Sequence, residues 1–225
     1  MKDTININSR RKFLGKMAAG TAVGLGTLAS PLAAFSNNRV STNKDAEVWF
    51  KNAKGSHRIV YDASEPHNAL PIIWSWVFYQ TNNESGTPDN DMTAMVVFRH
   101  NAIPFAFEDR IWKKYKLGEV FNIADNTTKK PAERNPYYTP GEGDFPFPGI
   151  DGIKKLQDRG AMFCVCNMAL KVYSGVVAQK FNLNAEDVLN DWKSGIHPNV
   201  QIVPSGVWAV GRAQENGFAY CYAGG

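Results

Sequence analysis

The most informative stretch for the fold is RGAMFCVCN, which occupies residues 159–167. Its centre, residues 161–166, is a short continuous apolar run of the kind that forms buried strands. The residues before it have apolar side chains at a spacing of three and predict a short helix over 150–159, which Gly160 ends. The residues after it predict a second helix over 170–181. A helix, a buried strand and another helix in succession indicate the α/β class.

The same alternation extends over most of the chain. Asn68 is the predicted N-cap of a core-facing helix that has Pro71 in its first turn. Strands separated by helices favour a mostly parallel five-stranded sheet with helices on both faces, which is a three-layer α/β fold. Further strands are predicted at residues 58–63, 92–98, 200–203 and 218–222, and further helices at 68–81, 105–116, from Asn184 onward, and at 206–216.

Two segments do not follow this alternation. Residues 37–56 are polar, with Val48, Trp49 and Phe50 as their anchors, and they predict a surface arm before a domain that spans residues 57–225. Residues 118–149 hold five prolines among aromatic side chains and have no periodicity. A segment of this length inside a domain is often a lid or a partner-contact surface. The alternative is an ordered loop that its aromatic side chains hold on the core.

Composition excludes several classes of protein. The chain has 225 residues, of which 44% are hydrophobic and 20% charged, so it is neither disordered nor fibrous. Its net charge of +4 resides in residues 1–36, which hold five basic side chains and one acidic one. The remaining residues are neutral overall, and we therefore expect no nucleic-acid partner. Three cysteines are too few for a disulfide scaffold or a four-thiolate zinc site.

The amino terminus has the pattern of an export signal. Ser9-Arg10-Arg11-Lys12-Phe13-Leu14 is a twin-arginine motif, and a glycine-rich apolar stretch and Pro31 follow it. We expect cleavage after Ser36 and a soluble periplasmic product. Because this route carries folded proteins, a bound cofactor is one hypothesis, although the sequence does not identify it.

A family resemblance rests on three stretches. Residues 159–167, VQIVPSGV at 200–207 and QENGFAY at 214–220 resemble the DsrE/DsrF-like family. The resemblance covers residues 58–222, with 118–149 as an insertion. It implies a three-layer α/β fold with Rossmann-like topology, assembly into homo-oligomers, and in some members sulfur transfer through a cysteine persulfide.

The predicted strands end in polar side chains that could form one site. The carboxyl ends of parallel strands meet at one edge of a sheet, where ligands bind. We therefore expect a rim at this edge, formed by Glu65, His67, Arg99, His100, Asn101, Cys166, Asn167 and Ser205.

Cys166 is the main catalytic candidate on this rim. A helix N-terminus and the cations Arg99 or His100 would favour its thiolate, so that Cys166 could hold a persulfide while His100 supplies charge or a proton. Arg99, Asn101, Asn167, Ser205 and His67 are candidate ligand-binding residues. The alternatives are that Cys166 is a small buried hydrophobe, and that Ser205 is only a helix N-cap.

The other cysteines and the histidines leave two alternatives open. Cys164 lies two residues before Cys166, on the same strand face, and is either a core residue or a disulfide partner of Cys221. A metal site formed by His67, His100 and Cys166 has suitable ligand types but no close-spaced motif. We therefore predict no metal.

Two functions remain from different classes. The first is an exported protein that binds or relays sulfur through Cys166, with a small molecule or a sulfur carrier as its partner. The second is a non-catalytic periplasmic module for ligand binding or oligomeric assembly.

Overall fold

The computed structural model describes residues 39–224. The predicted leader over residues 1–36 and its cleavage site lie outside the described residues. Residues from Val40 onward form one structural unit. No helix among the described residues is long and apolar enough to cross a membrane.

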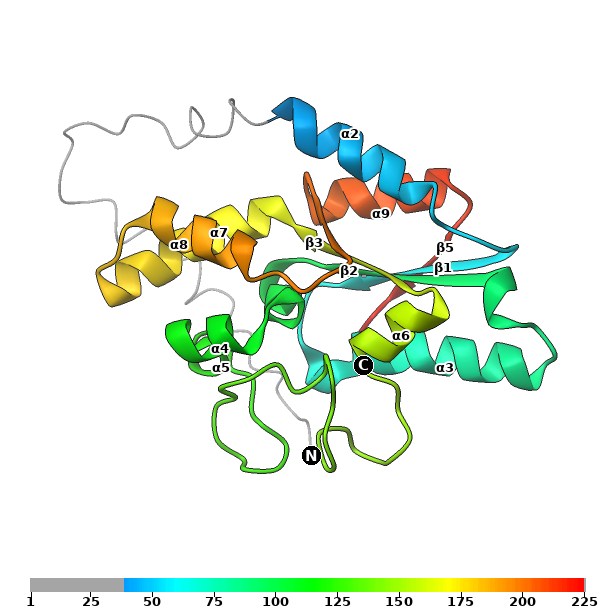
Figure 1. The fold of residues 1–225 in the computed structure, drawn as a ribbon, viewed down its shortest axis with the longest axis horizontal. Helices are drawn as coiled ribbons and strands as arrows, with labels where there is room; N and C mark the ends of the chain where they lie inside the picture. Colours follow the sequence, from blue (N-terminus) through cyan, green and yellow to red (C-terminus); the bar gives the residue numbers. More distant parts are fainter. Residues whose placement is uncertain (1–38, 225) are drawn as a thin grey trace, which may run out of the picture. The chain divides into compact units, whose positions relative to one another are not determined.

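The centre of the fold is a five-stranded parallel sheet, as the sequence predicts (Figure 1). Its order is β4-β3-β2-β1-β5, and every neighbouring pair of strands is parallel. β2 and β3 are buried along their whole length, which explains why their sequences are apolar apart from Thr93. The strands are β1 (His57–Ala63), β2 (Met92–Phe98), β3 (Met162–Cys166), β4 (Val200–Val203) and β5 (Ala219–Tyr222).

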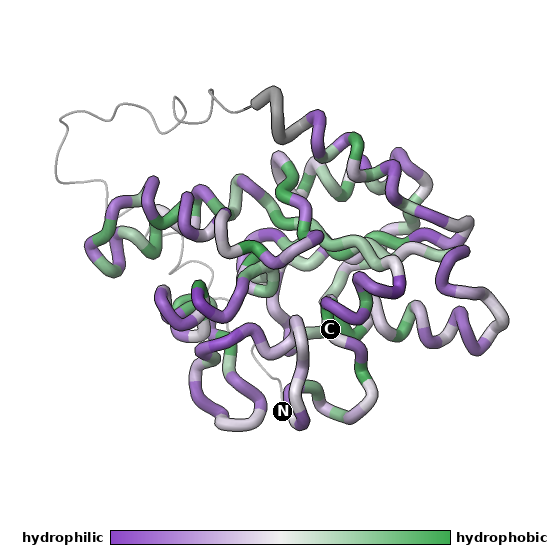
Figure 2. Tube along the Cα trace, viewed as in Figure 1, coloured by the Kyte–Doolittle hydropathy of each residue, from purple (hydrophilic) through white to green (hydrophobic). Residues whose placement is uncertain are grey.

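Helices cover both faces of the sheet, which gives three layers (Figure 1). α3 (Leu70–Glu84) and α6 (Ile153–Arg159) pack on one face, and α2 (Arg39–Phe50) and α9 (Gly206–Glu215) pack on the other. The hydropathy-coloured trace shows the apolar strands between these helices (Figure 2). The remaining helices are the 3-10 helices η2 (His67–Ala69), η3 (Asp89–Asp91) and η4 (His100–Ala106), and the α-helices α4 (Asp109–Tyr115), α5 (Leu117–Val120), α7 (Asn167–Phe181) and α8 (Ala185–Ser194).

The predicted surface arm is mostly a helix. Residues 39–50 form α2, whose Ala46 and Phe50 are buried against α9, with the Phe50 ring 5.9 Å from that of Trp208. Val48, one of the expected anchors, is 60% exposed. Ala46 and Phe50 are four residues apart and so lie on one narrow helix face, which a mostly polar composition conceals.

Asn68 is not the N-cap of the first long helix. His67, Asn68 and Ala69 all have left-handed backbone conformations, with φ of 41°, 50° and 70°. α3 therefore begins only at Leu70, and no side chain caps it. The chain makes a tight turn between β1 and α3, and this turn takes up the residues that the sequence assigns to the helix.

Other helix boundaries also differ from the predictions. The helix expected over 105–116 is split into η4 and α4, and α6 begins three residues later than expected, at Ile153. Its N-cap is Gly152, where a Cβ atom would lie 2.3 Å from Pro140. α7 begins earlier than expected, directly after Cys166.

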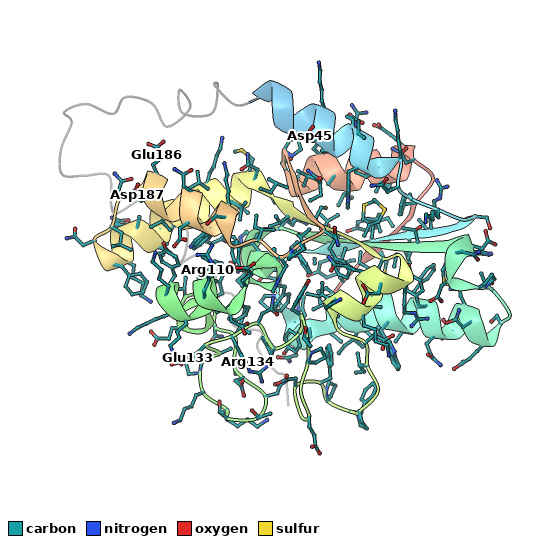
Figure 3. The ribbon with its side chains drawn as sticks, in the orientation of Figure 1. Asp45, Arg110, Glu133, Arg134, Glu186 and Asp187 are labelled. Atoms are coloured by element: carbon teal, nitrogen blue, oxygen red, sulfur yellow. The ribbon has the colours of Figure 1, made fainter. Side chains whose placement is uncertain are left out.

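The proline-rich segment is an ordered loop that packs on the core. Both Nη atoms of Arg134 donate to the fully buried Asp144, at 2.9 and 2.6 Å. The buried Asn135 donates to the carbonyl oxygens of Phe105 and Phe107, which fixes the segment to the chain between η4 and α4. Figure 3 labels Arg134 and its neighbour Glu133 in this segment.

The segment also contacts the residues that precede β4. The rings of Tyr138 and His197 stack face to face, 3.4 Å apart. Burial lowers the pKa of His197 to about 4, so its ring is neutral at ordinary pH.

We expect Asp144→Asn to loosen the proline-rich segment. Arg134 would keep only its longer ion pair with Asp125, and hydrogen bonds to a charged group such as the buried Asp144 contribute about 1.5–3 kcal/mol. Hydrogen exchange should therefore rise within residues 118–149 and leave the sheet strands protected. Glu133→Gln is the matched control, because Glu133 is exposed. Equal exchange in the two variants would contradict this assignment.

Candidate functional site

The carboxyl edge of the sheet brings together most of the predicted rim residues. They form two neighbouring groups rather than one cluster. One group surrounds Asp62 and Arg99, and it includes Ser205 and Cys166. The other group surrounds Glu65 and includes His100 and Asn101. His67 belongs to this second group because it lines the same pocket as Glu65.

The first group is centred on a buried ion pair that the sequence did not predict. The Nε and Nη2 atoms of Arg99 donate to the two carboxylate oxygens of Asp62, at 2.5 and 2.9 Å. Asp62 is only 5% exposed, and it also accepts a hydrogen bond from the Tyr220 hydroxyl at 3.1 Å. The hydrogen bond to Asp62 is the main cause that raises the pKa of Arg99, so the guanidinium stays charged. Arg99 is therefore a charged residue with a structural role at the carboxyl edge of the sheet.

The start of α9 packs closely on Arg99. Ser205 is the N-cap of α9, and its hydroxyl accepts from the backbone N–H of Trp208 at 3.2 Å, which is the capping role considered above. At Gly206, a Cβ atom would lie 2.6 Å from the Cβ of Arg99. Glycine is therefore required for α9 to approach this closely.

Cys166 lies at the N-terminus of α7, as the sequence predicts. Its sulfur accepts a hydrogen bond from the backbone N–H of Ala169 at 3.3 Å, and the residue is 6% exposed. Cys166 is also among the groups that raise the pKa of Arg99, after the larger effect of Asp62. Asn167 follows as the first residue of the helix, and its side-chain oxygen is enclosed with no hydrogen-bond partner among the described residues.

The second group is held by the carboxylate of Glu65. His100 Nδ1 lies 2.9 Å from Glu65 Oε1, and the amide of Asn101 donates to Glu65 Oε2 at 2.8 Å. His100 has a left-handed backbone, with φ of 51°, and its ring contacts the Tyr173 ring edge to face. The side-chain partner of His100 is therefore Glu65, and no hydrogen bond joins it to Cys166 among the described residues.

A pocket of about 370 Å³ opens beside this group. Its polar wall comes from the loops after β1 and β2, and its apolar wall includes Phe121, Ile123 and Tyr137 from the segment after α5. His67 lies at this wall, and its Nε2 is 3.1 Å from the hydroxyl of Tyr222 on β5. Four of the lining residues, His67, Asn68, Ala69 and Asn122, have left-handed backbones.

The structure does not bring the proposed metal ligands together. His67 is near Tyr222, His100 is near Glu65, and Cys166 is at the start of α7. In residues 39–224 no group of three His, Cys, Asp or Glu side chains is arranged to hold a metal ion.

The expected alternative of a Cys164–Cys221 disulfide is wrong. β1 and β2 lie between β3 and β5, so the two cysteines are three strand spacings apart, about 14 Å, whereas a disulfide needs Cα atoms within about 7 Å. All three cysteines are free. Cys164 is fully buried in the core, where burial strongly raises the pKa of its thiol.

Cys164 and Cys166 also pack in different places. Cys164 belongs to the cluster that faces α2 and α9, and Cys166 belongs to the cluster on the other face. The expectation of a shared face fails because the chain turns into α7 directly after Cys166.

Several residues of the site were not predicted from the sequence. The sequence could have indicated Asp62, because a carboxylate at the end of an apolar strand is unusual. The sequence gives no indication that Tyr220 and Tyr222 of β5 belong to the site, because their roles depend on β5 lying beside β1. Asn122 and Tyr137 reach the pocket only through the path of the irregular segment.

Comparisons with known proteins give little further information. No family model matches this chain, and no curated protein matches it. Among solved structures, it is similar to protein MTH1491 of unknown function from Methanobacterium thermoautotrophicum, with 16% sequence identity and a TM-score of 0.38. The similarity covers 74% of this chain and 99% of that chain. The likeness to the DsrE/DsrF-like family therefore stays a prediction.

We expect the three thiols to differ in their reaction with iodoacetamide. Cys221 is partly exposed and should react first in the folded protein, whereas the fully buried Cys164 should react only after unfolding. Mass spectrometry of the labelled peptides measures this order, and Cys221→Ser should remove the fast phase. A Cys164–Cys221 cross-linked peptide from an oxidised sample would show that the strand order is wrong.

Proposed function

We propose that this protein binds a small molecule with an N–H donor group and an apolar body, in the pocket beside Glu65. The carboxylate of Glu65 carries the proposal. A carboxylate has about four acceptor positions, and His100 and Asn101 use one on each oxygen. The two remaining positions are available to a ligand at a carboxylate whose orientation is already fixed.

The pocket lining supports this ligand class. Neither lysine nor arginine lines the pocket, so its formal charge comes from Glu65. Phe105, Phe121 and Ile123 give the apolar wall on which a hydrocarbon or aromatic ring can pack. A volume of about 370 Å³ is within the range of small-molecule sites, which begins at about 300 Å³.

The backbone around the pocket supports binding as well. Left-handed conformations of residues other than glycine are costly, and they gather at functional sites. His67, Asn68 and His100 have such conformations at the ends of β1 and β2. Such conformations persist only where the surrounding structure holds them, so the polar wall is formed before a ligand arrives, which lowers the entropic cost of binding.

Benzamidine is a suitable probe, because it joins a cationic N–H donor to an aromatic ring. We expect it to bind to the wild-type protein and benzoate, which has the opposite charge, not to bind. Glu65→Gln should weaken benzamidine binding at least about tenfold, because a charge-assisted hydrogen bond becomes a neutral one. Isothermal titration calorimetry measures the binding, and backbone amide chemical shifts of Glu65 and residues 67–69 measure its location.

Glu84→Gln is the matched control for this experiment. Glu84 is an exposed carboxylate at the end of α3, where it accepts a hydrogen bond from Gln80. The control should bind benzamidine as the wild type does. Unchanged affinity in Glu65→Gln, or equal binding of benzoate, would refute the proposed ligand class.

A second candidate function is sulfur binding or relay through Cys166, in an exported protein of the periplasm. One observation favours it: the sulfur atom accepts a helix N-terminal N–H and is electrostatically coupled to Arg99. These groups would stabilise a thiolate or a persulfide anion. In the loading step, the Cys166 thiolate attacks a terminal sulfur of the donor, and the shortened donor leaves as an anion, so no external oxidant is needed.

Inorganic polysulfide tests this second function. We expect the wild-type protein to gain about 32 Da per loaded sulfur, to lose it on reduction, and to carry it on Cys166. In a Cys221→Ser background, which removes the partly exposed thiol, Cys166→Ser should abolish the loading, whereas Cys221→Ser alone should keep it on Cys166. Loading that persists in the Cys166→Ser/Cys221→Ser double variant would exclude the relay.

A further inference from the structure

A second and larger cavity lies at the opposite edge of the sheet. It has a volume of about 650 Å³ and borders the residues before β3 and β4 and the end of α2. Because the strands are parallel, this is the amino edge, whereas the Glu65 pocket is at the carboxyl edge. The two cavities therefore share no lining residue.

The cavity at the amino edge is positively charged. Lys51 and Lys54 line it, and no Asp or Glu side chain does. Neither lysine has an ion pair with any part of the chain that the structure describes. Glu47, four residues before Lys51, pairs with Arg212, and Asp91 accepts from Ser56. Two uncompensated ammonium groups at one cavity attract an anion.

The remaining walls combine amides and one aromatic ring. Asn52 and Asn199 have side-chain amides with no hydrogen-bond partner among residues 39–224. Gln157 donates through its amide nitrogen to the carbonyl of Pro198, which leaves its side-chain oxygen as an acceptor. The half-buried Trp49 forms an apolar wall. Amides can both donate and accept, and they therefore match hydroxyl groups.

We infer that this cavity binds a small anionic polyol of the sugar phosphate class. Lys51 and Lys54 hold the acidic group, and the amides of Asn52 and Asn199 contact the hydroxyl groups. The volume of about 650 Å³ is in the middle of the range for small-molecule sites. The site is independent of the Glu65 pocket and of Cys166, so neither of those functions has to hold for it.

Glucose 6-phosphate is the probe for this site. We expect saturable binding at up to about 10 mM ligand in low salt, with a change in the fluorescence of Trp49. The double variant Lys51→Gln/Lys54→Gln should weaken binding at least about tenfold. Lys129→Gln/Lys130→Gln is the matched control, because it removes two exposed lysines outside the cavity and should leave the affinity unchanged.

Further measurements test the contributions of the phosphate group and of the sugar to binding separately. Glucose should not bind, and inorganic phosphate should bind more weakly than glucose 6-phosphate. Asn199→Gly should reduce this preference for the sugar, because it removes an amide and tolerates the left-handed backbone of Asn199, whose φ is 61°. Trp49→Phe should abolish the fluorescence change, and thermal melting verifies that each variant is folded.

Three results would overturn the inference. The first is that neither glucose 6-phosphate nor phosphate binds to the wild-type protein. The second is that Lys51→Gln/Lys54→Gln, when folded, binds as tightly as the lysine control. The third is that phosphate binds as tightly as glucose 6-phosphate, which would leave an anion site without recognition of a polyol.

Discussion

The ion pair between Asp62 and Arg99 is the interaction on which the carboxyl edge of the sheet depends. A carboxylate that is 5% exposed needs a partner, because burying an unpaired charge is costly. The pair joins β1 to the residue that follows β2, Tyr220 adds β5, and Gly206 brings α9 against the arginine. Three strands and one helix are therefore arranged around a single buried charge.

The two edges of the sheet differ in charge, and this difference separates their expected ligands. At the carboxyl edge, Arg99 is neutralised by Asp62, and the charge that remains open to a ligand is the carboxylate of Glu65. At the amino edge, Lys51 and Lys54 have no carboxylate near them in the cavity lining. The sheet thus separates the site that we propose for N–H donors from the site that we propose for anions.

Much of the fold could be predicted because it follows from local patterns. Continuous apolar runs between helical patterns identified all five strands, and their parallel arrangement identified the edge where the rim residues gather. The order of the strands has no local signal, which is why the Cys164–Cys221 pairing was wrong and the roles of Tyr220 and Tyr222 were missed. The choice of Glu65 as the partner of His100 depends on a left-handed backbone at His100, which a histidine in a sequence does not reveal.

The strand order also has a consequence for how the chain folds. β5 pairs with β1, and the hydrogen bond from Tyr220 to Asp62 joins residues 158 positions apart in the chain. Closing so long a loop costs entropy before any contact is gained, which slows folding. During synthesis from the amino terminus, β1 can pair with β2 early, but its other side stays open until β5 has been made. A nascent chain therefore exposes one unpaired side of β1 until β5 follows, and aggregation of incomplete chains is the hazard that this topology carries.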